Sequence, residues 1–250
     1  CKTCNKVEVE TIKLPCGNDC NMYTISSIHD FIQFVGFGKY LNKSDSVVMF
    51  RGQTGLYSGK MSPSLYRGQE KFAKKRDVFF TNIKTIKQSD KFSDYEKRTL
   101  EALLQHYGIK TTQIDCVDNI WIALWFATHK AKSRIVDGHE HIYYYENDDE
   151  FSYVFLLACD GVNKYSNGIY EGEKCILRDL RIVLPSYFLR PHAQHAYMIM
   201  KKEDTNDFSD LIIGIAKIET QKALKWIGNS EILSVYSLFP SAVHDSGYEF

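Results

Sequence analysis

An arginine placed directly after a short apolar run is the first feature of the chain that could perform chemistry. Val47 to Phe50 form that run, and Arg51, Gly52 and Gln53 follow it. A guanidinium group can hold two phosphate oxygens at once, and glycine lets a ligand approach the backbone. The pattern therefore indicates an anion site at the end of a buried strand. The alternative is a buried ion pair between Arg51 and a carboxylate such as Asp115.

A polar loop after this motif adds donors near the arginine. It contains Tyr57 and leads to Ser62, Ser64 and Arg67. The two serine hydroxyls could contact the same ligand as the arginine.

A second polar group lies at the joint between two expected helices. Apolar spacing predicts one helix from Asp94 to Tyr107 and a buried one from Ile120 to about Lys130, capped by Asp118 or Asn119. Buried polar groups need partners, so the joint is either a structural hydrogen-bond hub or the wall of a site. Its polar residues are His106, Tyr107, Thr111, Thr112, Gln113 and Asp115.

A third polar group lies late in the chain, in a turn that runs into an expected strand. Arg190, Gln194 and His195 are its members, and the apolar residues from Ala196 to Met200 follow them. This turn resembles the region around Arg51, because both lie next to a buried strand.

Four of the seven cysteines lie within the first 24 residues, as Cys1, Cys4, Cys16 and Cys20. Two pairs of closely spaced thiolates could hold a structural zinc ion in tetrahedral geometry. Free thiols or a disulfide are the alternatives. An odd number of cysteines argues against the disulfide framework of a secreted protein, so we expect a cytoplasmic location.

Composition limits the possible partners. The 250 residues carry 31 basic and 31 acidic side chains, and this balance provides no global electrostatic argument for nucleic acid or a membrane surface. No apolar run approaches the roughly 18 residues of a membrane span, so no membrane partner is expected.

Helical patterns dominate before residue 140 and strand patterns after it. Expected strands include residues 141–146, 153–158, 182–184 and 211–218, and expected helices include Ser26 to Gly36 and residues 71–90. This segregation predicts a single α+β domain whose helical N-terminal half packs on a mainly antiparallel sheet. Residues 1–24 form an N-terminal extension, and the domain covers residues 25–250.

Three groups of motifs, in this order and spacing, resemble the FRG domain family, which is named after a Phe-Arg-Gly tripeptide. The resemblance covers about residues 25–250, and the family has no assigned activity. In place of the usual Gln-x-Gly, Gln194 is followed by His195 and Ala196. The motifs are Phe50 to Gln53 with Pro63 to Arg67; Gln105 to Gly108 with Thr111 to Asp115 and Ala123 to Ala127; and Arg190-Pro191 and Gln194 with Leu238 to Pro240 and Gly247 to Glu249.

The layout also looks like that of ADP-ribosyltransferases, which bind NAD with an arginine, a serine segment and a late carboxylate. This resemblance implies an ADP-ribosyltransferase-like fold that binds NAD. The implied activity is that of an ADP-ribosyltransferase or an NAD glycohydrolase, and the implied role is modification of a macromolecule in bacterial or phage conflict. The late position holds Gln194 or His195, neither of them a carboxylate. The implied catalytic residues are His106, Gln194 and Asp115, and the implied cofactor-binding residues are Arg51, Gln53, Tyr57, Ser62 and Arg190.

Two other hypotheses use the same residues. A non-catalytic module could sense a nucleotide or a nucleic-acid end through Arg51, Arg67 and Arg190. A purely structural role would instead bury Arg51 against Asp115 without a cleft. We expect Arg51, His106, Asp115 and Gln194 to converge on one cleft.

Overall fold

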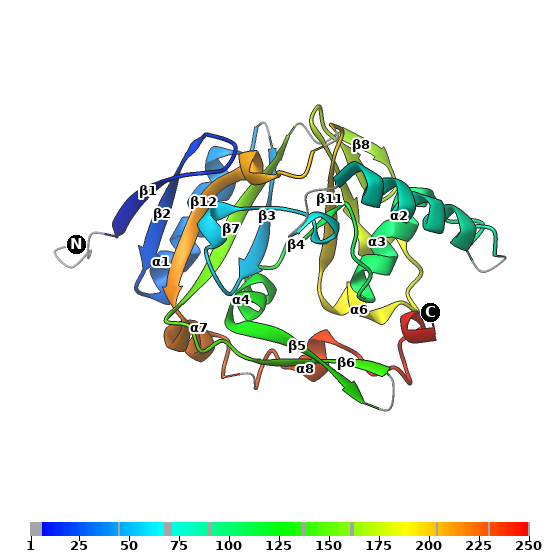
Figure 1. Ribbon diagram of the computed structural model, residues 1–250. Helices are drawn as coiled ribbons and strands as arrows, with labels where there is room; N and C mark the ends of the chain where they lie inside the picture. Colours follow the sequence, from blue (N-terminus) through cyan, green and yellow to red (C-terminus); the bar gives the residue numbers. More distant parts are fainter. Residues whose placement is uncertain are drawn as a thin grey trace.

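Strands from both halves of the chain form one large sheet in the computed structural model, which describes residues 7–44, 46–67, 72–89, 92–136, 139–160, 163–203, 205–229 and 231–249. Within these residues the strand order is β1-β2-β12-β7-β3-β4-β11-β10-β9-β8 (Figure 1). Neighbouring strands are antiparallel except β2 and β12, which are parallel. The strands are β1 (Glu8–Lys13), β2 (Asp19–Ile25), β3 (Ser46–Gln53), β4 (Ile114–Val117), β7 (Phe151–Asp160), β8 (Asn163–Ser166), β9 (Ile169–Glu171), β10 (Cys175–Asp179), β11 (Ala196–Lys201) and β12 (Ile212–Glu219).

The sheet forks at its centre. Strands β3 and β4 are in register only at Phe50 and Val117 within the described residues. Past this pair the two strands separate, so that the sheet has one half from β1 to β3 and another from β4 to β8 (Figure 1). Arg51 and Asp115 lie just inside the fork, one on each strand.

The first half of the sheet is covered by α1 (Ile28–Leu41), α4 (Ile120–Thr128) and α7 (Thr220–Trp226). Helix α4 is buried because its sequence is apolar nearly all round. It lies directly on β3, and a Cβ atom on Gly52 would be 1.8 Å from the Ala123 carbonyl oxygen. Glycine at position 52 is therefore needed for helix packing. Because Gly52 also lines the cavity described below, the expectation that it lets a ligand approach the backbone stays a prediction.

The second half of the sheet carries α2 (Phe72–Ile86), α3 (Lys97–His106), α5 (Leu180–Val183) and α6 (Leu189–Ala193). A separate core joins these helices to β11 through Phe79, Leu100, Leu103 and Met198. The remaining elements are the hairpin of β5 (His129–Val136) and β6 (His139–Glu146), the helix α8 (Val235–Leu238), and the 3-10 turns η1 (Tyr57–Gly59), η2 (Ser64–Tyr66), η3 (Ser209–Leu211) and η4 (Ser246–Glu249).

The predicted α+β class with a mainly antiparallel sheet is confirmed. Helix α1 lies where the sequence predicts a helix, and it is capped by Ser27, whose hydroxyl accepts a hydrogen bond from the Asp30 amide at 3.1 Å. The stretch predicted as an extension contributes β1 and β2 to the same sheet.

Two local expectations are wrong. Residues 182–184 are not a strand, because the Asp179 carboxylate accepts a hydrogen bond from the Arg181 amide at 3.0 Å and starts α5. The helix expected to reach Lys130 ends at Thr128, and the chain continues as β5.

No helix in the described residues is long and apolar enough to cross a membrane.

Candidate functional site

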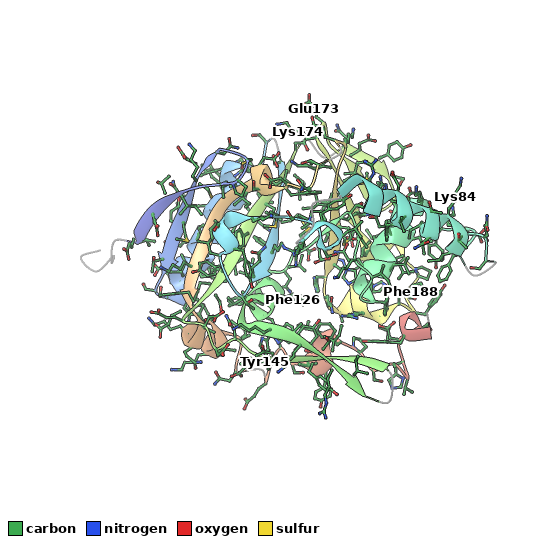
Figure 2. The ribbon with its side chains drawn as sticks, viewed as in Figure 1. Lys84, Phe126, Tyr145, Glu173, Lys174 and Phe188 are labelled. Carbon is green, nitrogen blue, oxygen red and sulfur yellow. The ribbon has the colours of Figure 1, made fainter. Side chains whose placement is uncertain are left out.

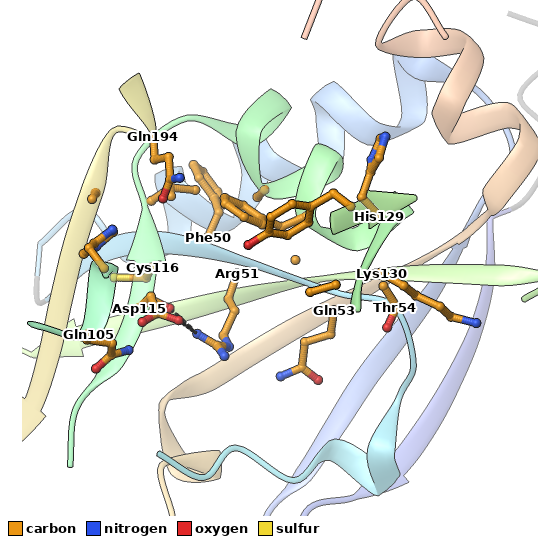
Figure 3. Close-up of a pocket in the computed structure, with 18 of the residues that line it drawn as sticks. Phe50, Arg51, Gln53, Thr54, Gln105, Asp115, Cys116, His129, Lys130 and Gln194 are labelled. Carbon is orange, nitrogen blue, oxygen red and sulfur yellow. Dashed lines mark hydrogen bonds and ion pairs between the residues drawn. The ribbon is translucent and has the colours of Figure 1, made fainter. Parts of the chain in front are cut away.

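A cavity of about 860 Å³ opens at the fork between β3 and β4 (Figure 3). Its walls come from both strands, from α3, α4 and α6, and from the β5–β6 hairpin. All eight residues that the sequence assigns to catalysis or cofactor binding line it: Arg51, Gln53, Tyr57, Ser62, His106, Asp115, Arg190 and Gln194. The structure therefore brings these side chains together, while their individual roles stay predictions.

Arg51 spans the fork and contacts Asp115 (Figure 3). Its Nη1 atom donates to the Asp115 carboxylate at 3.0 Å and to the Asp115 carbonyl at 2.5 Å. The arginine side chain is 14% exposed and the aspartate side chain 45%. The buried Nε atom of Arg51 has no hydrogen-bond partner among the described residues. The ion pair considered from the sequence is thus present, but it lies in a cavity wall and leaves a donor unused.

Positive charge is in excess within the cavity. Asp115 is the only carboxylate among the described lining residues, and it is already shared with Arg51. The Nε atom of Arg67 donates to the Ser62 carbonyl at 3.1 Å. Burial, and then the nearby Arg51 guanidinium, lower the pKa of Arg67. An anion would relieve this crowding of cations. The lining cations are Arg51, Lys60, Arg67, Lys130 and Arg190, of which Lys130 forms ion pairs with Asp148 and Asp149 outside the lining.

His106 at the end of α3 is a neutral group in this cavity. Burial lowers its pKa to about 4, an effect opposed by Asp115, reinforced by Arg190 and opposed by a hydrogen bond with Gln194. Its Nε2 atom is buried without a hydrogen-bond partner among the described residues. A neutral imidazole can donate a hydrogen bond to a hydroxyl group or accept one from it. Near pH 7 it has no positive charge with which to bind a phosphate.

The depressed pKa of His106 should make the fold sensitive to acid. Between pH 6.5 and about 4 the unfolded chain binds a proton that the folded chain does not, so stability falls as the pH falls. One pH unit between the two pKa values corresponds to about 1.4 kcal/mol, so acidification from pH 7 to 4 should cost about 3 kcal/mol through this residue. Urea unfolding across this range should show a shallower pH dependence for His106→Gln.

The exposed His29 offers a control for this measurement. The variant His29→Gln should keep the pH dependence of the wild type. Equal pH dependence in the wild type and His106→Gln would contradict the assignment of a neutral buried imidazole.

The C-terminal segment positions the late polar group. The buried carboxylate of Asp245 accepts hydrogen bonds from the Tyr107 hydroxyl at 2.6 Å and from the Arg190 amide, at the start of α6, at 3.0 Å. The Gln194 amide donates to the Leu238 carbonyl at 2.9 Å. These contacts fix both ends of α6, and with it the side chains that reach the cavity.

Aromatic rings form another part of the wall. The rings of Tyr144 and Phe239 stack with centroids 4.3 Å apart, and the Arg190 guanidinium lies 4.5 Å from the Phe239 ring centre. Tyr57 is 63% exposed at the edge of the cavity, and its hydroxyl contacts the Thr54 hydroxyl at 3.1 Å. The Ser62 hydroxyl donates to the Asn206 carbonyl at 2.8 Å.

Sequence reasoning missed several lining residues on the β5–β6 hairpin, at the end of α3 and directly after η1. Lys60, Gln105, His129, Lys130 and Tyr144 belong to this group. The sequence pattern predicts Lys130 at a helix end, whereas the alternation of basic and small residues from 130 to 134 is the signal that could identify β5.

The zinc prediction falls partly outside the described residues, because Cys1 and Cys4 lie there. Cys16 is exposed, whereas Cys20 is buried and its pKa is raised to about 11 by burial and then by Cys16. No group of three or more metal-ligating side chains occurs within the described part of the chain. The zinc site stays a prediction.

Residues 46–135 match the family model of the FRG domain, so this part of the chain is an FRG domain. The match includes Arg51, His106 and Asp115, and it ends before Arg190 and Gln194. No curated protein and no solved structure matches the chain.

Proposed function

We propose that this FRG-domain chain binds a nucleotide of the NAD class in the cavity and cleaves its nicotinamide–ribose bond, as an ADP-ribosyltransferase or NAD glycohydrolase does. The observation that carries the proposal is the excess of cations around one carboxylate in a single cavity. A pyrophosphate supplies the anionic charge that this wall lacks. The volume of about 860 Å³ lies within the usual range of ligand pockets.

The lining residues suit the parts of such a ligand. Arg51 and Arg67 would hold the pyrophosphate. Each guanidinium has nitrogens that form no hydrogen bond within the described residues, and the charge of Arg51 already lowers the pKa of Arg67. The exposed ring of Tyr57 would stack on a base. Neutral His106 and Gln194 would contact ribose hydroxyls, and Ser62, whose proton is already donated, would accept from one.

Asp115 would serve the chemical step. When the bond between C1′ of the ribose and the nicotinamide nitrogen breaks, the electron pair leaves with nicotinamide and positive charge develops on the ribose. A half-exposed carboxylate beside that charge stabilises it. Water, or a nucleophile on a macromolecule, then attacks C1′ and loses a proton.

The test is nicotinamide release from NAD by the wild type and Asp115→Asn. The amide keeps the shape of the side chain and removes its charge, so release should fall by about 100-fold or more while NAD affinity changes only a few-fold. Asp94→Asn, at an exposed position outside the cavity, should match the wild type. Release at the wild-type rate by Asp115→Asn would remove Asp115 from the mechanism.

A second candidate is a sensor that binds a nucleotide without turnover. The observation that favours it is the ion pair between Asp115 and Arg51, which occupies the only carboxylate among the described lining residues. Calorimetric binding of NAD without nicotinamide release by the wild type would select this function over the enzyme.

A further inference from the structure

A second basic hollow lies outside the cavity, between α2, α3 and the end of β11. It has a volume of about 630 Å³ and we refer to it as the α2–α3 groove. Lys84, labelled in Figure 2, lies on its α2 side. Its described lining includes two carboxylates, Asp77 and Glu203, and six cationic side chains: Arg76, Lys84, Lys97, Arg98, Lys201 and Lys202.

Part of this positive charge has no carboxylate partner within the described part of the chain. Among the described residues, neither Lys84 nor Lys97 forms an ion pair. Burial, and then the neighbouring Arg98, lower the pKa of Lys97; Lys84 acts in the same direction, while Glu101 and Glu96 oppose it. Like charges held together in this way attract an external anion.

The ring of Phe80 holds two of the cations over the groove. The Lys97 ammonium lies 3.9 Å from the ring centre and the Arg98 guanidinium 4.5 Å. Both contacts keep the positive groups close to the groove. They also cover the ring, so it offers little surface for a base to stack on.

We propose that the α2–α3 groove binds the phosphodiester backbone of a single-stranded nucleic acid. Four of the six lining cations pair with carboxylates, which leaves Lys84 and Lys97 to contact phosphates, and a strand presents phosphates in series. A hollow of about 630 Å³ suits one backbone better than a duplex, and the absence of a free aromatic platform among the described lining residues directs the contacts to phosphates. Binding should therefore tolerate many sequences. The zero net charge of the whole chain hides this local feature.

The groove and the cavity share two chain segments as their walls. Tyr66 lines the groove and its neighbour Arg67 lines the cavity. Likewise, Thr112 lines the groove and Asp115 the cavity. A strand in the groove would thus lie beside the NAD site, which makes nucleic acid the candidate acceptor of ADP-ribose. This last step rests on the proposed function, whereas binding to the groove does not.

Fluorescence anisotropy with labelled RNA and DNA strands of about 12 nucleotides tests the groove. The variant Lys84→Glu/Lys97→Glu should weaken binding by about tenfold or more and lower the salt dependence, because phosphate contacts are lost. The control Lys132→Glu/Lys225→Glu makes the same change in net charge at exposed positions outside the groove, and it should bind like the wild type.

Each outcome of this experiment bears on the proposal. Loss confined to the groove variant supports it, and comparison of the two strands shows whether the ligand is RNA, DNA or either. Equal loss in the control variant, or no binding of either strand by the wild type, would overturn it. The groove variant should keep the NAD affinity of the wild type, so failure of the NAD site is seen separately.

Discussion

Replacing Asp245 with alanine should lower the free energy of unfolding by about 3–5 kcal/mol. Asp245 is buried, with only 1% of its surface exposed. Its carboxylate accepts hydrogen bonds from the Tyr107 hydroxyl and from the amides of Leu189, Arg190 and Gly247, at 2.6–3.3 Å. Alanine would leave these donors buried without an acceptor. Urea unfolding at neutral pH measures the loss.

Two variants control for this effect. Asp245→Asn retains one acceptor oxygen and most of the volume, so it should be less destabilised than the alanine variant. The exposed Asp94→Ala should change stability by less than about 0.5 kcal/mol. A loss below about 1 kcal/mol in Asp245→Ala would show that the C-terminal segment does not hold α6 in place.

The variant Arg51→Gln should lose about 100-fold or more in NAD affinity. Truncating one partner of a buried, charge-assisted contact typically costs about 2–5 kcal/mol, and a 100-fold change corresponds to about 2.7 kcal/mol. Glutamine keeps a polar side chain between β3 and β4, but it has no charge and lacks the paired N–H donors with which a guanidinium binds phosphate. Isothermal titration calorimetry with NAD measures the change directly.

Because Arg51 also pairs with Asp115, the variant must be shown to be folded by circular dichroism before titration. Lys60→Gln removes a charge from an exposed lining residue, and its affinity should fall by less than about tenfold. If a folded Arg51→Gln bound NAD as tightly as the wild type, Arg51 would have only a structural role between β3 and β4 and no role in binding NAD.

Local sequence patterns predicted the polar groups that form the cavity. Arg51 follows an apolar run within β3, His106 ends an amphipathic helix, and Gln194 precedes another strand, so each position could be predicted from its neighbours. The expectation that they converge came from their motif context, and the cavity contains them all.

The fork itself could not be read from the sequence. The register of β3 against β4 joins residues more than 60 positions apart, and local periodicity carries no information on where such strands separate. The same holds for Asp245, whose partners Tyr107, Leu189 and Arg190 come from two distant segments. The error at residues 182–184 has a different cause, since three apolar residues cannot distinguish a strand from one turn of helix.

The α2–α3 groove was hidden for a related reason. Lys84 and Lys97 each occur in a charged segment that is typical of a solvated helix face, and only the packing of α2 beside α3 brings them to one hollow. Summed over the chain, their charge is cancelled by carboxylates elsewhere.

The most direct test of the central claim is a crystal structure of the chain with a carbocyclic NAD analogue, whose bond to nicotinamide resists hydrolysis. We predict the pyrophosphate between Arg51 and Arg67, and the sugar next to nicotinamide beside Asp115. An analogue that bound only in the α2–α3 groove, or an empty cavity at saturating concentration, would contradict the account of this cavity as an NAD site.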